Sequence, residues 1–320
     1  MRLLFILFLA FGFSLFCKGQ DSESGPGYQL ILMNNPALSG SEGDGVIRLS
    51  YHNYYPGNNY NLHSVYFSYD SYIPSLHGGI GVYVSDDYMG GIANEMKGGI
   101  SYSYFLKAGK DLFINAGLSA SVFHRGLNFN GAILPDQIDP LGGVVFPTAD
   151  VLTNSGKSVF DIGAGFLIMT GRLTGGLSVS HLAEPDLTEN KSTDEKLKRK
   201  LLLHVTYDIN LNKSSNLKLR PLGYLVMQGG YVSAGAGTVL ESNYLSVNAL
   251  LLEDNWNNLN MQTGFSVKTG RMSIYYNYRF NISSGNNMMP FSLLHQTGLA
   301  FSLNNVDKRK TIKTINFPKL

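Results

Sequence analysis

Charged residues are scarce in this 320-residue sequence: Asp, Glu, Lys and Arg make up 15% of it, against about a quarter in soluble domains. The 25 basic and 23 acidic side chains nearly balance, which argues against a nucleic-acid-binding protein. No apolar run of about 18 residues follows Gln20, so the sequence predicts no transmembrane helix. Its 19 tyrosines and 36 glycines argue against a disordered chain or a coiled coil.

Cysteine is almost absent, because Cys17 is the only one. It ends an apolar run, Leu3 to Phe16, that follows a basic start and is too short to span a bilayer. This pattern predicts a signal peptide over residues 1–19, cleaved after Gly19. A lipoprotein anchor at Cys17 is the less favoured alternative, because no small residue directly precedes the cysteine. After cleavage the chain contains no cysteine, which excludes disulfides and thiol chemistry.

Apolar and polar residues alternate with a period of two through most of the chain. In the first such segment Ile47, Leu49 and Tyr51 share one face, opposite Arg48, Ser50 and His52. This alternation is typical of strands. Most segments are about 10 to 12 residues long, enough to cross a membrane when tilted. We predict fourteen strands, near residues 45–54, 62–72, 77–86, 92–106, 111–129, 157–168, 171–182, 199–210, 216–227, 231–239, 243–253, 258–268, 271–281 and 292–303.

The connections between these strands differ in length by parity. Those after even-numbered strands are short, and the long ones all follow odd-numbered strands: 130–156, 183–198 and 282–291. Short periplasmic turns with longer extracellular loops and an even strand count are typical of outer-membrane barrels. We therefore predict an all-β fold, a transmembrane antiparallel β-barrel of about 14 strands over residues 45–303. A soluble sandwich has no reason to show this parity.

The predicted barrel assigns side chains to its two faces. Charged and polar residues that would be costly in lipid are expected in the lumen: Arg48, His52, Asp70, Glu95, Arg125 and Arg279. Aromatic residues near strand ends are expected in the interfacial girdles: Tyr54, Tyr55, Tyr72, Tyr102 and Tyr275. Glycines within strands are expected to permit curvature and close packing of inner side chains: Gly79, Gly81, Gly163, Gly165, Gly235 and Gly237.

No motif indicates catalysis, a cofactor or a metal ion. The seven histidines lack the HExxH spacing of zinc sites, and no Gly-x-Ser-x-Gly stretch occurs. Gly163-Ala164-Gly165 begins like a dinucleotide-binding motif but lacks the third glycine and the following helix. Asp136, Asp139 and Asp150 share one long loop without the spacing of an EF-hand. We expect a solvated loop there and a protein without enzymatic activity.

Two segments outside the barrel remain. In residues 20–44, predicted to be periplasmic, Asn35-Pro36 indicates a turn before the first strand. A simple strand-entry turn is favoured from sequence, with a periplasmic plug or docking segment as the alternative. Residues 304–320 form a basic tail, also predicted to be periplasmic, that either is solvated or contacts anionic lipid or a partner through Lys308, Arg309, Lys310, Lys313, Phe317 and Pro318.

The mature sequence resembles the PorP/SprF family of type IX secretion system outer-membrane proteins. The resemblance rests on Tyr28-Gln29, on Tyr51-His52-Asn53-Tyr54-Tyr55, on the ending Thr314 to Leu320 and on the stretch Asn34 to Gly40. The family-motif residues are Asn35, Pro36, Ala37, Gly40, Tyr51 and Asn53. The chain departs from the family pattern with His52 for Arg, Tyr55 for Trp and Phe317 for Cys, changes that leave the implied fold untouched.

The resemblance implies a non-enzymatic protein in the outer membrane of a Gram-negative bacterium. Such proteins support the secretion or cell-surface attachment of a particular large cargo, for instance a gliding adhesin. The implied partners are the cargo's C-terminal domain, the translocon and periplasmic, peptidoglycan-linked components, with membrane lipids around the barrel and no nucleic acid. A passive porin or small-solute transporter is the alternative, because a fourteen-stranded barrel is wide enough for a lumen.

Overall fold

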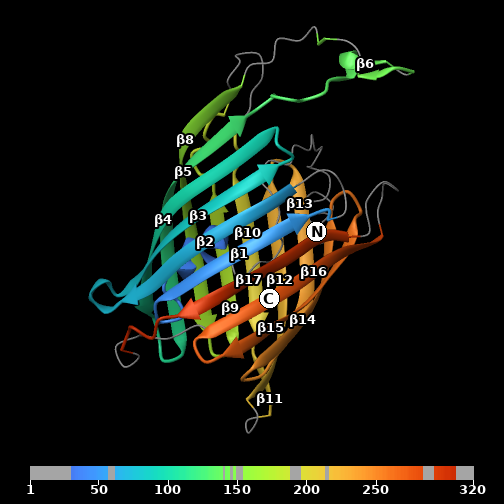
Figure 1. Ribbon diagram of the computed structural model, residues 1–320. Coiled ribbons are helices and arrows are strands. Elements are labelled where there is room, and N and C mark those ends of the chain that lie inside the picture. The colour runs from blue at the N-terminus through green and yellow to red at the C-terminus, as the bar shows by residue number, and fades with distance from the viewer. Residues whose placement is uncertain are drawn as a thin grey trace, which may run out of the picture.

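The computed structural model (Figure 1) describes residues 30–56, 62–139, 141–144, 147–148, 154–187, 196–212, 216–283 and 292–307. Nearly all of these residues belong to one antiparallel sheet. Its strands are β1 (Val46–Tyr54), β2 (Leu62–Ile73), β3 (Gly78–Met89), β4 (Ala93–Lys107), β5 (Leu112–Leu127), β8 (Ser155–Thr170), β9 (Leu173–Ser180), β10 (Lys200–Tyr207), β11 (Ile209–Asn212), β12 (Leu217–Gln228), β13 (Tyr231–Glu241), β14 (Leu245–Asp254), β15 (Leu259–Thr269), β16 (Met272–Ser283) and β17 (Ser292–Ser302).

The sheet closes into a barrel because β1 pairs with β17 from Val46↔Ser302 to Tyr54↔Leu294. All remaining strands of this sheet pair with the strands that precede and follow them in the sheet's chain order. Strands β10 and β11 form one pass across the barrel, since both pair with β12 and only Asp208 separates them. The barrel therefore has fourteen strands, and the predicted fold class and strand order are confirmed.

The two ends of the barrel differ. At one end the connections are short, such as η2 (Pro74–Leu76) between β2 and β3 and a two-residue turn at 270–271. At the other end the connection between β5 and β8 carries η3 (Pro135–Gln137) and a small hairpin of β6 (Ile138–Asp139) and β7 (Gly143–Val144), which projects beyond the barrel (Figure 1). In outer-membrane barrels short turns face the periplasm, so the first end is periplasmic.

The faces of the strands confirm most lumen predictions. Five of the six residues predicted for the lumen are buried, and Arg125 pairs with buried Glu95 at 2.6 Å. The outer face carries exposed apolar side chains such as Leu118 and Phe160. Two girdle predictions are wrong: Tyr72 and Tyr275 are buried and face inward. They fill space in the barrel, and the Tyr275 hydroxyl shares a hydrogen bond with the Ser50 hydroxyl.

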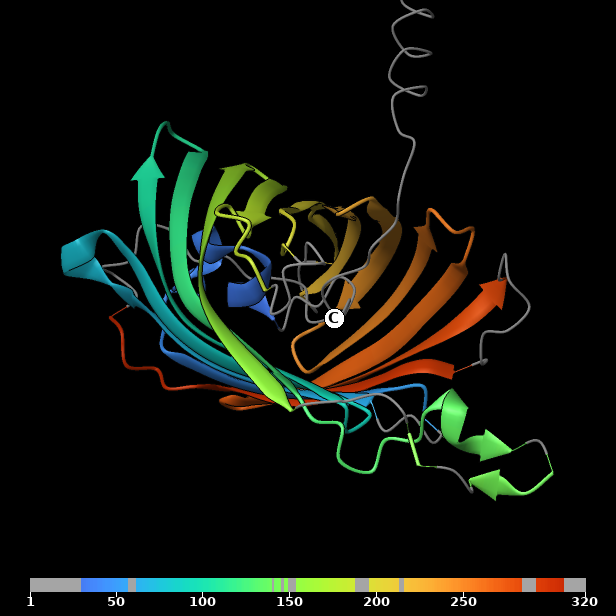
Figure 2. The ribbon, with the colours of Figure 1, turned by 90° about the horizontal axis from the view of Figure 1, so that it is seen from above.

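A segment preceding β1 lies inside the ring of strands (Figure 2). It comprises α2 (Ile31–Asn34), η1 (Pro36–Leu38) and a turn that leads to Gly45. We call residues 30–45 the plug segment. Among the described residues, no helix has the length and apolar character needed to cross a membrane.

Candidate functional site

The plug segment is held in shape by local hydrogen bonds around the Asn-Pro-Ala motif. The Asn35 side-chain oxygen accepts a hydrogen bond from the backbone N–H of Ala37 at 2.9 Å, and so caps η1. Pro36 occupies the first position of this turn, where its fixed φ fits and its missing N–H costs nothing. The Ser39 hydroxyl donates to the Pro36 carbonyl at 2.9 Å. Gly40 follows with a φ of 67°, a backbone conformation that favours glycine.

The plug backbone lies directly against the inner wall, at positions where the wall has no side chains. A Cβ atom on Gly165 would lie 2.0 Å from the Asn35 side-chain oxygen, and one on Gly117 would lie 2.2 Å from the Ala37 nitrogen. A Cβ on Gly79 would lie 2.0 Å from the Ser39 carbonyl oxygen. The role expected for strand glycines was close packing of inner side chains. At these positions the close packing is instead with the plug, whose backbone meets Gly117 and Gly79 and whose Asn35 side chain meets Gly165.

Polar side chains of the wall bind main-chain atoms of the plug. Asn115 on β5 donates to the Ala37 carbonyl at 3.4 Å, and Ser103 on β4 donates to the Ser39 carbonyl at 2.6 Å. Ser178 on β9 donates to the Asn34 carbonyl. These bonds satisfy carbonyl groups of an irregular segment that is shielded from water inside the barrel, where an unpaired group would be costly.

Asn35 also contributes its side chain to the contact with the wall. Its amide donates to the backbone carbonyls of Phe166 on β8 and Leu177 on β9, at 3.3 and 3.4 Å. Asn35 is therefore fully used: its oxygen caps η1, and its nitrogen bridges two strands. No other residue type of similar size offers both a donor and an acceptor in this arrangement.

Buried charges fix the end of the plug that approaches β1. Arg48 on β1 forms ion pairs with Glu42 of the plug and with Asp70 on β2, and both Arg48 and Asp70 are buried. Asp70 also accepts a hydrogen bond from the Gly40 N–H at 2.8 Å. Removing one member would leave a buried charge without its counter-charge, which is strongly destabilising.

Asp44 ties the base of the plug to the chain that follows β17. Its carboxylate accepts hydrogen bonds from the Ser302 hydroxyl at 2.8 Å and from the backbone N–H groups of Gly45, Asn305 and Val306 at 2.9, 2.8 and 3.3 Å. Burial by itself would raise the pKa of Asp44, but these hydrogen bonds outweigh it and hold the pKa below its ordinary value. Asp44 therefore joins the chain that enters the barrel before β1 to the chain that leaves it after β17, at the periplasmic rim.

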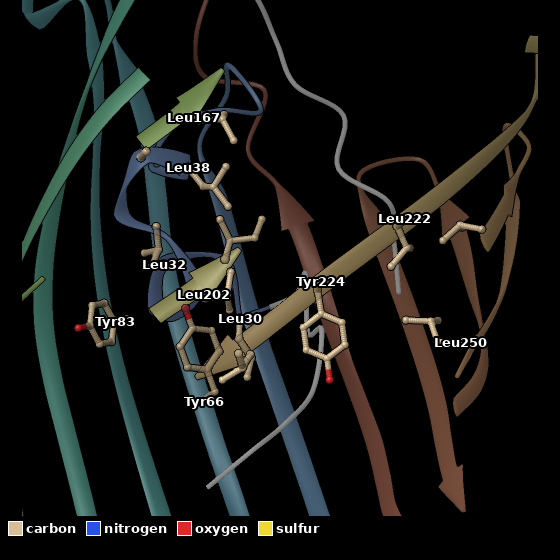
Figure 3. Packing of buried hydrophobic residues seen from close by; sticks show 14 of the residues in the cluster. Leu30, Leu32, Leu38, Tyr66, Tyr83, Leu167, Leu202, Leu222, Tyr224 and Leu250 are labelled. Atoms are coloured by element: carbon tan, nitrogen blue, oxygen red, sulfur yellow. The ribbon is translucent and has the colours of Figure 1, made fainter. Parts of the chain in front are cut away.

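The apolar side of the plug joins a buried cluster that crosses the lumen. Leu30, Ile31 and Leu32 belong to the same cluster as inward-facing residues of β2, β3, β5, β8, β10 and β12–β14, among them Tyr66, Tyr83, Leu202, Leu222, Tyr224, Leu250 and Leu252. Figure 3 shows this packing. From the sequence, two interpretations of this segment remained: a strand-entry turn, which was favoured, and a plug. The observed position inside the barrel favours the plug.

The structure separates the residues that the sequence grouped as one family motif. Asn35, Pro36, Ala37 and Gly40 meet in the lumen contact, whereas Tyr51 and Asn53 lie on the outer face of β1, opposite the buried Ser50 and His52. The suggested partner contacts Lys308, Arg309, Lys310, Lys313, Phe317 and Pro318 lie outside the described residues, as do residues 1–19 and Asp150. Asp136 and Asp139 lie in the long loop, and no metal-binding group of side chains occurs among the described residues.

Sequence reasoning missed Asp44 and the role of the strand glycines. Gly79, Gly117 and Gly165 each occupy an inward position of their strand. A group of inward glycines on β3, β5 and β8, close together in the barrel wall, is a signal that a backbone approaches there. It can be recognised only when the register of the strands is known.

These features define an outer-membrane β-barrel protein: a closed antiparallel barrel, an apolar outer face, a polar and filled interior, and short turns at one end with long loops at the other. The family profile described as type IX secretion system membrane protein PorP/SprF matches residues 28–296. The chain belongs to the PorP/SprF family, and it is an outer-membrane component of the type IX secretion system. No curated protein matches the sequence.

Solved structures with a similar fold are outer-membrane barrels of distant sequence. A deletion mutant (ΔS2S3) of TodX from Pseudomonas putida, a monoaromatic hydrocarbon channel, matches with a TM-score of 0.52 and 10% identity, covering 88% of this chain and 95% of that one. A second TodX deletion mutant matches with a TM-score of 0.51 and 11% identity, covering 85% and 93%. Omp33 of Acinetobacter baumannii has a TM-score of 0.49 and 10% identity, covering 83% and 100%. At these identities the likeness shows the fold alone.

The glycine contact predicts how the plug can be loosened. Ser41 is buried and its hydroxyl has no hydrogen-bond partner among the described residues, so Ser41→Cys provides a reporter in a chain whose other cysteine is Cys17. We expect Gly117→Ala to raise the rate of maleimide labelling of this cysteine at least about tenfold, which corresponds to a loss of about 1.4 kcal/mol in plug binding. Gly98→Ala is the matched control, because a Cβ there meets nothing within 4 Å. Equal labelling rates in the two variants would contradict the contact.

The carboxylate of Asp44 predicts a pH dependence of the plug. A folded-state pKa below the ordinary value of 3.8 stabilises the protein above that value, and this contribution is lost as the pH falls through the folded-state pKa. We expect Asp44→Asn to lower the free energy of unfolding by about 1.5–3 kcal/mol at pH 7, and the difference from the parent to shrink below about pH 4. Urea titrations in lipid vesicles measure both.

Asp139→Asn is the control for this prediction. Asp139 also accepts hydrogen bonds from backbone N–H groups, those of Leu141 and Gly142, but it lies in the long loop and does not touch the plug. Only Asp44→Asn should accelerate labelling at Ser41→Cys. A stability difference that stays constant from pH 7 to pH 3 would refute the role of the Asp44 charge.

Proposed function

We propose that this barrel supports the secretion or cell-surface attachment of one large cargo protein, such as a gliding adhesin, without enzymatic activity. The observation that carries the proposal is membership of the PorP/SprF family together with a lumen that holds the plug segment. In this proposal the extracellular loops or the lumen bind the C-terminal domain of the cargo. The basic tail contacts a periplasmic, peptidoglycan-linked component of the system, and the translocon delivers the cargo.

The interior supports a role in holding rather than in passing solutes. A porin needs a continuous polar channel, and fourteen strands would leave room for one. Here the plug places Leu30, Ile31 and Leu32 in the lumen, in one buried cluster with inward leucines of the opposite wall such as Leu222 and Leu250. An apolar cluster across the lumen opposes the flow of water and ions.

The extracellular end offers structured surfaces for a cargo. In the connection between β9 and β10, Leu187 and Leu197 are buried against Phe123 on β5 and Val159 on β8. The described ends of this connection therefore lie against the inner wall at the mouth of the barrel. The β6–β7 hairpin lies outside the ring of strands in Figure 2 and carries exposed apolar residues, with Leu141 completely exposed at its turn. Surfaces of this kind suit protein contact.

Deletion of the protein tests the cargo role and separates it from a porin role. We expect one or a few very large proteins to disappear from the cell surface, measured by surface biotinylation and mass spectrometry, while other type IX cargo remains. In planar bilayers the purified barrel should carry no large steady current, and a variant lacking residues 30–41 should carry one. An unchanged cell surface with a large current in the parent would establish a porin and refute the proposal.

The basic tail is tested by a truncation that spares the Asp44 contacts. Removing residues 308–320 leaves Ser302, Asn305 and Val306 in place, so the plug and barrel should remain intact by the Ser41→Cys labelling rate. We expect the truncated protein to lose co-purifying periplasmic proteins after mild cross-linking. Replacing only the basic residues of the tail by Gln is the matched variant for the charge. Unchanged partners in both variants would rule out the tail contact.

A further inference from the structure

A polar cavity lies at the periplasmic end of the barrel, against the wall that β12 to β15 form. Its volume is about 120 Å³, which gives room for several water molecules or one small anion, since about 10–15 Å³ of such space already holds a water. The cavity lies beside the short turn between β13 and β14, residues 242–244. Strands β12 to β15 are neighbours in the sheet (Figure 1). We call this space the rim cavity.

The lining of the rim cavity follows the inner face of these four strands. Four of its residues are direct register neighbours: Lys218↔Glu241, Glu241↔Ser246 and Ser246↔Ser266. Lys268 follows Ser266 by two residues and therefore shares its face of β15. The two serines are buried, whereas Lys268 is exposed at the rim. Both lysines therefore lie on the luminal side of the wall, away from the lipid-facing side.

The rim cavity carries a surplus of positive charge. Within the part of the chain that the structure describes, neither Lys218 nor Lys268 forms an ion pair. Glu241 lies opposite Lys218 in the register, but its carboxylate pairs with the buried guanidinium of Arg220 at 3.0 Å. Arg220 also pairs with Asp208. Three basic groups thus stand against two acidic ones, and the two lysines are the basic groups that line the cavity.

Hydrogen bonds hold the turn beside the rim cavity in one shape. The Asn216 amide donates to the side-chain oxygen of Asn243 at 2.9 Å, which joins the start of β12 to the turn. The Ser242 hydroxyl donates to the Leu245 carbonyl at 3.0 Å and accepts from the Leu245 N–H at 3.3 Å. A site that is formed before its ligand arrives loses less conformational freedom on binding. The rim cavity is such a preorganised site.

We propose that the rim cavity binds a small soluble oxyanion, a carboxylate or phosphate group that reaches it from the periplasm. The ammonium groups of Lys218 and Lys268 supply the opposite charge, and the amides and hydroxyls of the lining supply further hydrogen-bond donors. The luminal position of both lysines keeps them away from lipid headgroups. None of the described plug residues lines the cavity, so this site is separate from the plug contact. The inference does not depend on the proposed cargo role.

Lysine footprinting of the protein in phosphatidylcholine vesicles tests the site. An N-hydroxysuccinimide ester acetylates accessible lysines, and mass spectrometry gives the rate at each one. We expect millimolar phosphate or glutarate to slow acetylation of Lys218 and Lys268 at least about fivefold, because the bound anion covers both ammonium groups and keeps them protonated. Lys110, exposed in the turn between β4 and β5 at the same end, should react at an unchanged rate. The anion that protects at the lower concentration identifies the preferred group.

A single substitution separates binding from screening of charge. In Lys218→Gln the anion loses one of its two ammonium partners, so we expect about ten times more phosphate or glutarate to be needed for the same protection of Lys268. Lys110→Gln is the matched variant and should leave the protection of Lys218 and Lys268 unchanged. An unaltered labelling rate at Ser41→Cys shows that the plug stays in place in both variants.

Several outcomes overturn the proposal. Absence of protection by either anion would do so, and equal protection by chloride at the same ionic strength would reveal screening alone. Protection of Lys110 as well would reveal non-specific attraction to the rim. Protection that appears only in vesicles containing phosphatidylglycerol would assign the two lysines to lipid. Faster acetylation of both lysines after deletion of residues 20–29, with no anion added, would assign the cavity to the acidic residues Asp21 and Glu23 of this chain.

Discussion

The structure depends on the requirement that no backbone hydrogen-bonding group face lipid unpaired. That requirement is met by the pairing of β1 with β17, which removes the last two strand edges. Closure then forces an even number of strands, places both chain ends of the barrel at the same rim and fixes one inward and one outward face for every strand. Every second residue of each strand therefore faces the lumen. The inner surface that these residues form must be polar, packed against another segment, or both.

Local patterns predicted the wall well, because alternation along a strand depends on neighbours in sequence. Arg48, Asp70 and Glu95 were assigned inward from their own strands, and the structure buries all three. The girdle assignments of Tyr72 and Tyr275 failed for the same reason, since a tyrosine near a strand end looks identical whether it meets the membrane interface or a filled interior. Only the contents of the lumen distinguish the two, and these contents come from elsewhere in the chain.

From sequence the plug was only the alternative to a turn, and its contacts could not be predicted because they join residues far apart, from 30 positions for Gly40 and Asp70 to 142 for Asn35 and Leu177. Asn35 looked like part of a turn before a strand, which it is, but the acceptors of its amide are the carbonyls of Phe166 and Leu177. Gly79 and Gly165 looked like strand glycines with a role in curvature and packing, and only the register brings them against the plug. The β6–β7 hairpin was missed because two-residue strands show no period.

A fourteen-stranded barrel is too wide for its own side chains to fill, so a protein with this wall must either admit water or supply another segment. The inward leucines of the far wall show which solution this chain has adopted. Leu222, Leu250 and Leu252 would be unfavourable in a water-filled pore, and they are buried in one cluster with the plug. The plug is bound through its main chain and the glycines of the wall, and also through the side chains of Asn35, Glu42 and Asp44. With its lumen filled in this way, the barrel presents its extracellular end as the surface on which the proposed cargo contact depends.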